Sequence, residues 1–340
     1  FSCARPTMRL LSACCCGGLL LAPPPLSTVG PRTRIRLLHG DGWREAALES
    51  MAARQWSAIE PPIEAAVRGD ATLPGESEPP LPLPSPPPSD DGDRVHWRLT
   101  VAYHGATFSG FAWQKAAPLP TVEGCLQEAL RPLLDGKSEL RLSCAGRTDA
   151  GVSALGQLVS FHSSPQLGEA ELTEAIKRAA PRAGALRLVH ARRMAPGYHA
   201  TYSTAWRHYA YLLPPPPNAT RAAVAAEAAA LDKLLRPLAG APRDFAALGR
   251  GVPPGKDTTT TLRQASARLV EIGEMSETGD GGGAAATRID LLGDRFLRRQ
   301  VRVLVATTVA AAAAGSAAAA VAVDGGSEGA EGAEGAEGAE

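Results

Sequence analysis

The feature that most constrains the fold is a loop near the middle of the chain, within residues 144–161 (Cys-Ala-Gly-Arg-Thr-Asp-Ala-Gly-Val-Ser-Ala-Leu-Gly-Gln-Leu-Val-Ser-Phe). Apolar residues alternate with polar ones before the loop and form a run after it, which predicts a strand on each side. Gly146 and Gly151 bracket one arginine and one aspartate, and glycine permits a positive φ and the close approach of another molecule. Two strands that hold a charged loop commonly position a reactive group. The alternative is a simple turn in which Arg147 and Asp149 form a surface ion pair of little energetic weight.

The composition allows a sizeable core and gives a local hint of a partner. The 340 residues are 44% hydrophobic and 21% charged, which suits one large or two modest domains. The formal net charge is zero, so the whole-chain balance does not indicate a nucleic-acid partner. Residues 95–213, however, carry 13 lysines and arginines against 8 acidic residues, and a basic domain of this kind fits a polyanion.

The six cysteines predict neither a zinc site nor a disulfide framework, because no spacing among them resembles either. Cys125 and Cys144 are expected to be small buried apolar residues. A hydrolase that uses Cys144 or a serine as nucleophile is a further hypothesis, but the sequence offers no base and orienting group for it.

The first 93 residues are predicted to be a targeting segment followed by a disordered linker. No acidic residue precedes Asp41 although arginines do, which is typical of an import signal for a plastid or mitochondrion. A secretory-type signal is one alternative, and a cytoplasmic or nuclear protein is another. Prolines and glycines interrupt the apolar stretches, so no membrane span is expected. Residues 45–59 predict a short helix that Pro61-Pro62 ends, residues 74–93 form the Pro-rich linker, and the folded part is expected to begin near Arg94.

The remaining periodicity indicates alternating strands and helices. Strands are predicted at 96–103, 140–144, 158–161, 186–189, 261–272 and 287–292, and helices at 121–134, 172–180, 219–236 and after 296. Thr121 is the expected N-cap of the first of these helices, and Pro132 is expected to end or kink it. This order predicts an α+β fold with an N-terminal half at 94–213, a C-terminal half at 214–323 and an acidic Gly-Ala-Glu tail at 324–340.

Several strings resemble one known family. Gly-Arg-Thr-Asp-Ala-Gly-Val, followed by Gly156-Gln157 and Phe161, resembles the signature of the tRNA pseudouridine synthase A (TruA) family. Thr-Val-Glu-Gly at 121–124 resembles the family's Thr-Val-Gln-Gly, and residues 296–302 resemble its Phe-Leu-x-x-Met-Val-Arg. Residues 198–211 resemble Phe-His-Ala-Arg-Phe-Ser-Ala followed by Arg-x-Tyr-x-Tyr. The family's closing C-terminal strand has no counterpart in the acidic tail.

The resemblance implies two similar halves, each a mainly antiparallel sheet flanked by helices, with an RNA-binding cleft between them. It implies an isomerase that converts uridine to pseudouridine in the anticodon arm of tRNA. Such an enzyme breaks the N1–C1′ bond, turns the base and rejoins it through C5, with no metal or other cofactor. The resemblance also implies a homodimer that holds tRNA.

The same resemblance assigns roles to residues. Asp149 is the implied catalytic carboxylate, which acts as nucleophile or base. Arg302 is its implied partner, which keeps the carboxylate ionised; Tyr209 stacks on the target base, and Arg147 replaces the extruded base or contacts phosphate. Further substrate-binding residues are predicted at Gly146, Thr148, Gln157, Phe108 and Arg207.

A second hypothesis is a catalytically impaired RNA-binding paralog of the same fold. The chain departs from the family pattern at several positions, which are His104, Ser153, Lys177, Arg243 and Gln300. The joint presence of Asp149, Arg147, Tyr209 and Arg302 favours the enzyme.

Overall fold

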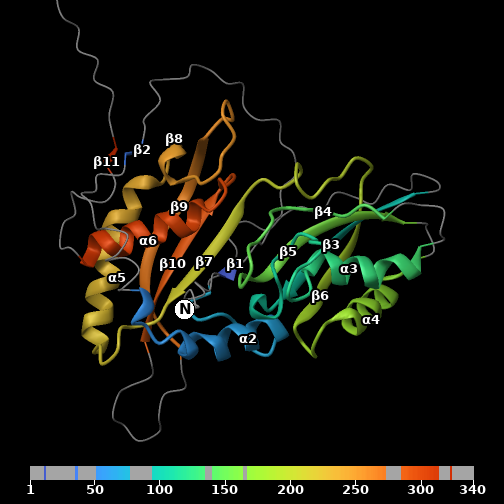
Figure 1. The fold of residues 1–340 in the computed structure, drawn as a ribbon, viewed down its shortest axis with the longest axis horizontal. Coiled ribbons are helices and arrows are strands. Elements are labelled where there is room, and N and C mark those ends of the chain that lie inside the picture. Colours follow the sequence, from blue (N-terminus) through green and yellow to red (C-terminus); the bar gives the residue numbers. More distant parts are fainter. Residues whose placement is uncertain are drawn as a thin grey trace, which may run out of the picture.

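A computed structural model describes residues 11–12, 35–36, 51–76, 94–134, 140–163, 167–272, 285–313 and 322–323 of the chain. Within them, two four-stranded antiparallel sheets lie edge to edge and are joined into one sheet (Figure 1), in the order β6-β3-β5-β1-β7-β10-β9-β8 with β4 paired to β5. The predicted α+β fold of two similar halves is confirmed. The acidic tail, most of the targeting segment and most of the linker lie outside the described residues.

The N-terminal half is built as the periodicity predicts. Its strands are β3 (Val95–Tyr103), β4 (Ser143–Cys144), β5 (Ser153–Ser163) and β6 (Leu186–Met194), and its helices are α3 (Val122–Leu130) and α4 (Glu169–Ala179). The Thr121 hydroxyl caps α3 by accepting a hydrogen bond from the Gly124 N–H at 3.2 Å. Apolar residues of the strands and both helices form one core.

The C-terminal half repeats the scheme with its own core. Its sheet includes residues 207–213, which the predicted boundary placed in the N-terminal half. Its strands are β7 (Arg207–Leu213), β8 (Pro242–Asp244), β9 (Thr259–Glu271) and β10 (Ala285–Gly293), and its helices are α5 (Arg221–Leu235) and α6 (Gln300–Ala313). The first helix of each half ends in the same short turn, Arg131-Pro132-Leu133 after α3 and Arg236-Pro237-Leu238 after α5. Proline cannot continue the α-helical hydrogen-bond ladder, so the last turn tightens into a 3-10 helix.

A two-residue strand, β1 (Leu11–Ser12), fills the seam between the halves. It pairs in parallel with β5 and antiparallel with β7. A separate pair joins β2 (Ile35–Arg36) to β11 (Ala322–Val323). No helix among the described residues is both long and apolar enough to span a bilayer.

Residues 51–76 belong to the fold, in contrast to the prediction that folding begins near Arg94. Pro61 and Pro62 lie in the first turn of α2 (Glu60–Arg68) instead of ending a helix, because proline is well tolerated where no N–H partner is needed. Ile59, Ile63 and Ala66 pack against Ala210 and Leu212 of β7. The neighbouring Tyr211 and Leu213 belong to the core under α5 and α6, so α2 covers the opposite face of the seam. We call residues 51–76 the brace.

The brace contacts both halves. Arg54 is buried, and its guanidinium bonds to Glu227 of α5 at 2.5 Å and to the Pro214 carbonyl at 2.8 Å. On the other side, Glu64 pairs with Arg182 at 2.5 Å, and this hydrogen bond lowers the pKa of the Glu64 carboxyl. One polypeptide segment therefore ties the two sheets together behind the seam.

Candidate active site

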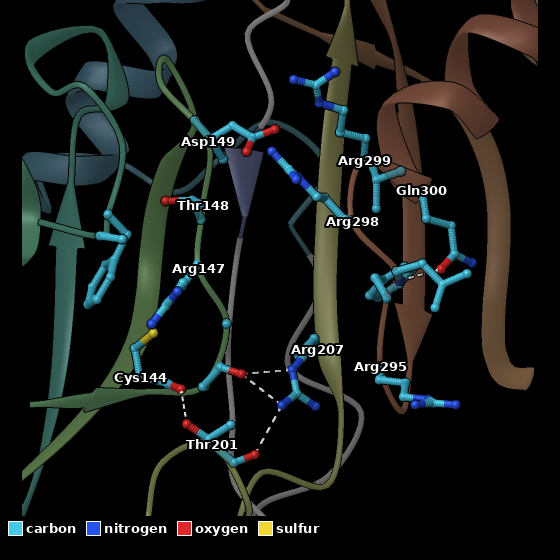
Figure 2. Close-up of a pocket in the computed structure, with 18 of the residues that line it drawn as sticks. Cys144, Arg147, Thr148, Asp149, Thr201, Arg207, Arg295, Arg298, Arg299 and Gln300 are labelled. Atoms are coloured by element: carbon cyan, nitrogen blue, oxygen red, sulfur yellow. Dashed lines mark hydrogen bonds between the residues drawn. The ribbon is translucent and has the colours of Figure 1, made fainter. Parts of the chain in front are cut away.

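A cleft of about 1000 Å³ opens at the seam on the face opposite the brace. The N-terminal half lines it with residues 142–150, and the C-terminal half with residues 251–253 and 295–302 (Figure 2). Neither half contains the cleft alone, so the site exists only when the two sheets are joined.

The loop that carries Asp149 is held in place from below. The Thr148 hydroxyl is buried and lies 2.8 Å from the Tyr103 hydroxyl, and the Thr148 carbonyl accepts a hydrogen bond from Phe111 N–H at 3.0 Å. Gly110 has a φ of 105°, and a side chain there would begin 3.0 Å from the same carbonyl. The chain turns back at Gly151, whose φ is 80°. These contacts fix the backbone on both sides of Asp149, which lines the cleft.

Asp149 forms an ion pair across the seam. Its Oδ2 lies 3.3 Å from Nε of Arg302, which stands in the first turn of α6. Arg302 also donates to the Ala150 carbonyl at 3.3 Å. The Asp149 side chain remains 53% exposed, so one side of the carboxylate is open to the cleft. Among the described residues, the partner of Asp149 is thus Arg302 and not its neighbour Arg147, which is exposed.

Three residues predicted to bind substrate have structural contacts, and one of them, Arg207, also lines the cleft. Arg207 donates to the carbonyls of Ala145 at 2.7 Å, Asp294 at 2.6 Å and Thr201 at 3.2 Å, so its guanidinium clamps backbone segments of both halves (Figure 2). Gln157 is fully buried, and its side chain donates to the Gly146 carbonyl at 2.5 Å.

Phe108 is the third of these residues, and it is only 2% exposed. Its ring packs against Tyr103 in a T-shaped arrangement within the core, with the centroids 6.1 Å apart. A strand-end aromatic beside glycine indicates a core corner as readily as a base-stacking residue, so the pattern alone could not separate the two. Gly146 and Thr148, which are also predicted to bind substrate, line the cleft.

Tyr209 also lines the cleft and is half-buried. Its ring stands edge-on to Phe296, with centroids 5.0 Å apart and planes at 83°. Tyr209 comes from β7 and Phe296 from the segment before α6, so both belong to the C-terminal half. An aromatic face at this position is suited to stack on a base.

Cations surround the cleft on the side of the C-terminal half. Lys256, Arg295, Arg298 and Arg299 line it, and Arg295 is itself held by Asp257 at 2.9 Å. Arg299 adopts a φ of 62°, which is uncommon for a residue other than glycine. The loop 251–256 was not predicted to line a site, because its sequence shows only a Gly- and Pro-rich stretch that ends in a lysine.

Three of the five departures from the family pattern lie away from Asp149 and Arg302, whereas Gln300 lines the cleft. The Ser153 hydroxyl accepts a hydrogen bond from Gly105 N–H at 2.8 Å and so supports the turn after β3. Lys177 is exposed on α4, and Arg243 donates to the Pro237 carbonyl at 2.9 Å at the outer edge of the other half. None of the three lines the cleft. The described residues contain no cluster of three or more His, Cys, Asp or Glu arranged to hold a metal.

Known proteins resemble up to 65% of this chain. No protein-family profile matches it. A tRNA pseudouridine synthase A of Neisseria gonorrhoeae is 31% identical over 221 residues, which is 65% of this chain and 79% of that protein. The chain belongs to the tRNA pseudouridine synthase A family. A member from Streptomyces avermitilis is 40% identical over 119 residues, 34% of this chain and 41% of that protein.

Proposed function

We propose that this chain is a tRNA pseudouridine synthase that isomerises uridine to pseudouridine, with Asp149 as the group that acts on the ribose. One observation carries the proposal. In a chain of this family, the carboxylate of the N-terminal half meets the Arg302 guanidinium of the C-terminal half at 3.3 Å inside a cationic cleft.

The reaction matches what the cleft offers. The N1–C1′ bond breaks, the base turns, and a C5–C1′ bond forms, while C5 loses a proton and N1 gains one. Atoms and electrons balance without an oxidant, a reductant or net hydrolysis. The protein must supply a carboxylate beside the sugar, as nucleophile or base, and must hold it still. Arg302 holds the Asp149 carboxylate from one side, and the opposite side stays open to substrate.

The cleft also suits an extruded nucleotide. The target base must leave the RNA stack before its sugar can be reached. Tyr209 and Phe296 provide aromatic surface for that base, and Arg298 and Arg299 are exposed at the rim, where phosphates pass. Arg147, also exposed on the catalytic loop, is placed to contact phosphate or to replace the extruded base.

We propose three further features of this function from the family resemblance and from the composition of the N-terminal segment. They are the anticodon arm as the modified region, a homodimer that shares the tRNA, and import into a plastid or mitochondrion.

A catalytically impaired RNA-binding paralog is the second candidate, motivated by the departures at Ser153, Lys177 and Arg243. Because none of these side chains lines the cleft, their replacement leaves the reactive groups in place. This placement favours the enzyme.

The test is tritium release from tRNA transcripts that carry 5-tritiated uridine, since C5 loses its hydrogen once per turnover. The wild-type chain should release tritium, and Asp149→Asn should release it slower by roughly three orders of magnitude. Asp70→Asn is a matched control, because Asp70 is similarly exposed (59%) and pairs with Arg68 at 2.6 Å outside the cleft. Tritium release by Asp149→Asn at the wild-type rate would contradict the assignment of Asp149. If a folded wild-type chain binds tRNA but releases no tritium, the RNA-binding paralog is the function that remains.

A further inference from the structure

Tyr202 is unusually exposed for an aromatic side chain. It is 81% exposed, and the other exposed large apolar side chains among the described residues are Trp113 at 56% and Leu119 at 46%. One face of the Tyr202 ring lies on His199, with ring centroids 4.6 Å apart and planes tilted by 34°. The high exposure leaves the rest of the ring accessible to another flat group.

The stack is held rigidly. The His199 Nε2 lies 2.9 Å from the Ser143 hydroxyl, which fixes the imidazole beneath the tyrosine. The Tyr202 N–H donates to the His199 carbonyl at 3.0 Å, and the His199 N–H donates to the Ser203 hydroxyl at 3.2 Å. A ring that is already ordered loses little conformational freedom when a ligand stacks on it.

The stack adjoins the cleft. Thr201, the preceding residue, lines the cleft, and its hydroxyl donates to the Cys144 carbonyl at 2.7 Å. Arg207 clamps the Thr201 carbonyl from the other side. Figure 2 shows Thr201 and Cys144 at the end of the cavity away from Asp149. An RNA strand that places its target uridine at Asp149 would extend its neighbouring nucleotides toward this end.

We propose that Tyr202, backed by His199, stacks on an unpaired RNA base that flanks the target uridine. The inference rests on the proposed function and names a further binding residue for the same substrate. Extrusion of the target removes a stacking partner from its neighbours, and an exposed aromatic side chain can replace that partner for any base. The contact would strengthen binding of the strand without taking part in chemistry.

The test pairs enzyme variants with substrate variants. In an Asp149→Asn background, affinity is measured for an anticodon-arm RNA hairpin and for versions with an abasic nucleotide on the 5′ or the 3′ side of the target. Tyr202→Ala should weaken binding of the intact hairpin about ten-fold, whereas Tyr202→Phe keeps the ring and should bind like the parent. On the hairpin that lacks the stacked base, Tyr202→Ala should cause no further loss. Leu119→Ala, an exposed apolar residue outside the cleft lining, should leave affinity unchanged.

Equal losses on the intact and both abasic hairpins would overturn the stacking assignment, as would unchanged affinity of Tyr202→Ala. In the active enzyme, Tyr202→Ala should raise KM for the RNA about ten-fold and leave kcat within about two-fold. Since the binding cycle requires no turnover, an inactive wild type would refute the proposed function while the affinity measurements still decide the role of Tyr202.

Discussion

In both halves of the sheet, the first strand leads into a helix with a threonine cap, and an Arg-Pro-Leu turn ends that helix. The next strand then takes a different place in each half. In the N-terminal half, β4 pairs with the edge of β5 that faces the seam, whereas in the C-terminal half β8 lies at the outer edge of the sheet. The loop after β4 therefore enters the seam and carries Asp149 into the cleft.

The halves consequently contribute opposite charges to one site. The N-terminal half brings the carboxylate of Asp149, and the C-terminal half brings Arg302 and most of the rim cations. Two sheets of similar build thus contribute different side chains to one site, because β4 pairs at the edge that faces the seam and β8 pairs at the outer edge. Variants in each half test this division of roles.

The largest effect is expected where the charges of the two halves meet. Arg302→Ala removes the guanidinium that positions Asp149 and should lower kcat by about 10²–10³-fold, with a smaller change in KM. Steady-state tritium release measures both. Arg302→Lys keeps a charge but loses the fork geometry, so it should recover only part of the rate. A KM effect alone would mean that Arg302 binds RNA and does not support Asp149.

The brace offers the next largest effect. Arg54→Ala leaves Glu227 without its partner and the Pro214 carbonyl without a donor, which should lower the free energy of unfolding by about 3 kcal/mol in urea titrations. Arg236→Ala is the control, because the Arg236 side chain is 74% exposed and its pair with Asp232 should contribute about 1 kcal/mol or less. Equal losses in the two variants would show that Arg54 does not anchor the brace to the C-terminal half.

A buried carboxylate in the C-terminal half should make stability depend on pH. Asp290 is almost fully buried; burial raises the pKa of its carboxyl, but hydrogen bonds from His208 and Arg288 outweigh this effect and hold the pKa below its usual value. Because the folded-state pKa is depressed, the stabilisation is fully present above the unfolded pKa of about 4 and is lost as the pH falls through the folded pKa.

Asp290→Asn should therefore cost about 2 kcal/mol at pH 7, because Arg288 stays buried without its charge partner, and the cost should shrink as the pH drops toward 3. Urea titrations between pH 7 and pH 3 measure it, with Asp70→Asn, on an exposed carboxyl, as the comparison. A cost that is constant across this range would mean that the Asp290 charge does not stabilise the fold.

The smallest effects test the repeated start of the halves. Thr121→Ala and Thr220→Ala each remove an N-cap hydroxyl that accepts from the third residue along at 3.2 Å, and each should cost about 1 kcal/mol in thermal or urea unfolding. Serine at either position keeps the hydroxyl and should restore most of the lost free energy of unfolding. A much larger loss at one cap than at the other would show that the two helices are not equivalent supports.

Most of the fold and the family could be predicted from the sequence, which also pointed to Asp149, the carboxylate that we propose as the reactive group. Helix and strand periods are local properties, so most elements of both halves, the cap at Thr121 and the turn at Pro132 were predicted correctly. The strands β7 and β8 were not predicted. The string around Asp149 is long enough to identify a family. The proline rule failed at Pro61-Pro62, because proline favours the first turn of a helix as well as its end.

Which distant residues meet in one site is visible in the tertiary structure alone. Asp149 and Arg302 are 153 positions apart, and only the pairing of strands across the seam brings them to 3.3 Å. The same holds for residues 51–76, which precede a Pro-rich stretch but pack behind the sheet, and for Arg207, whose donors are taken up by carbonyls of both halves. A sequence does not show whether a polar side chain bonds to the backbone or faces the substrate. Its burial and the positions of its hydrogen-bond partners in the folded protein decide this.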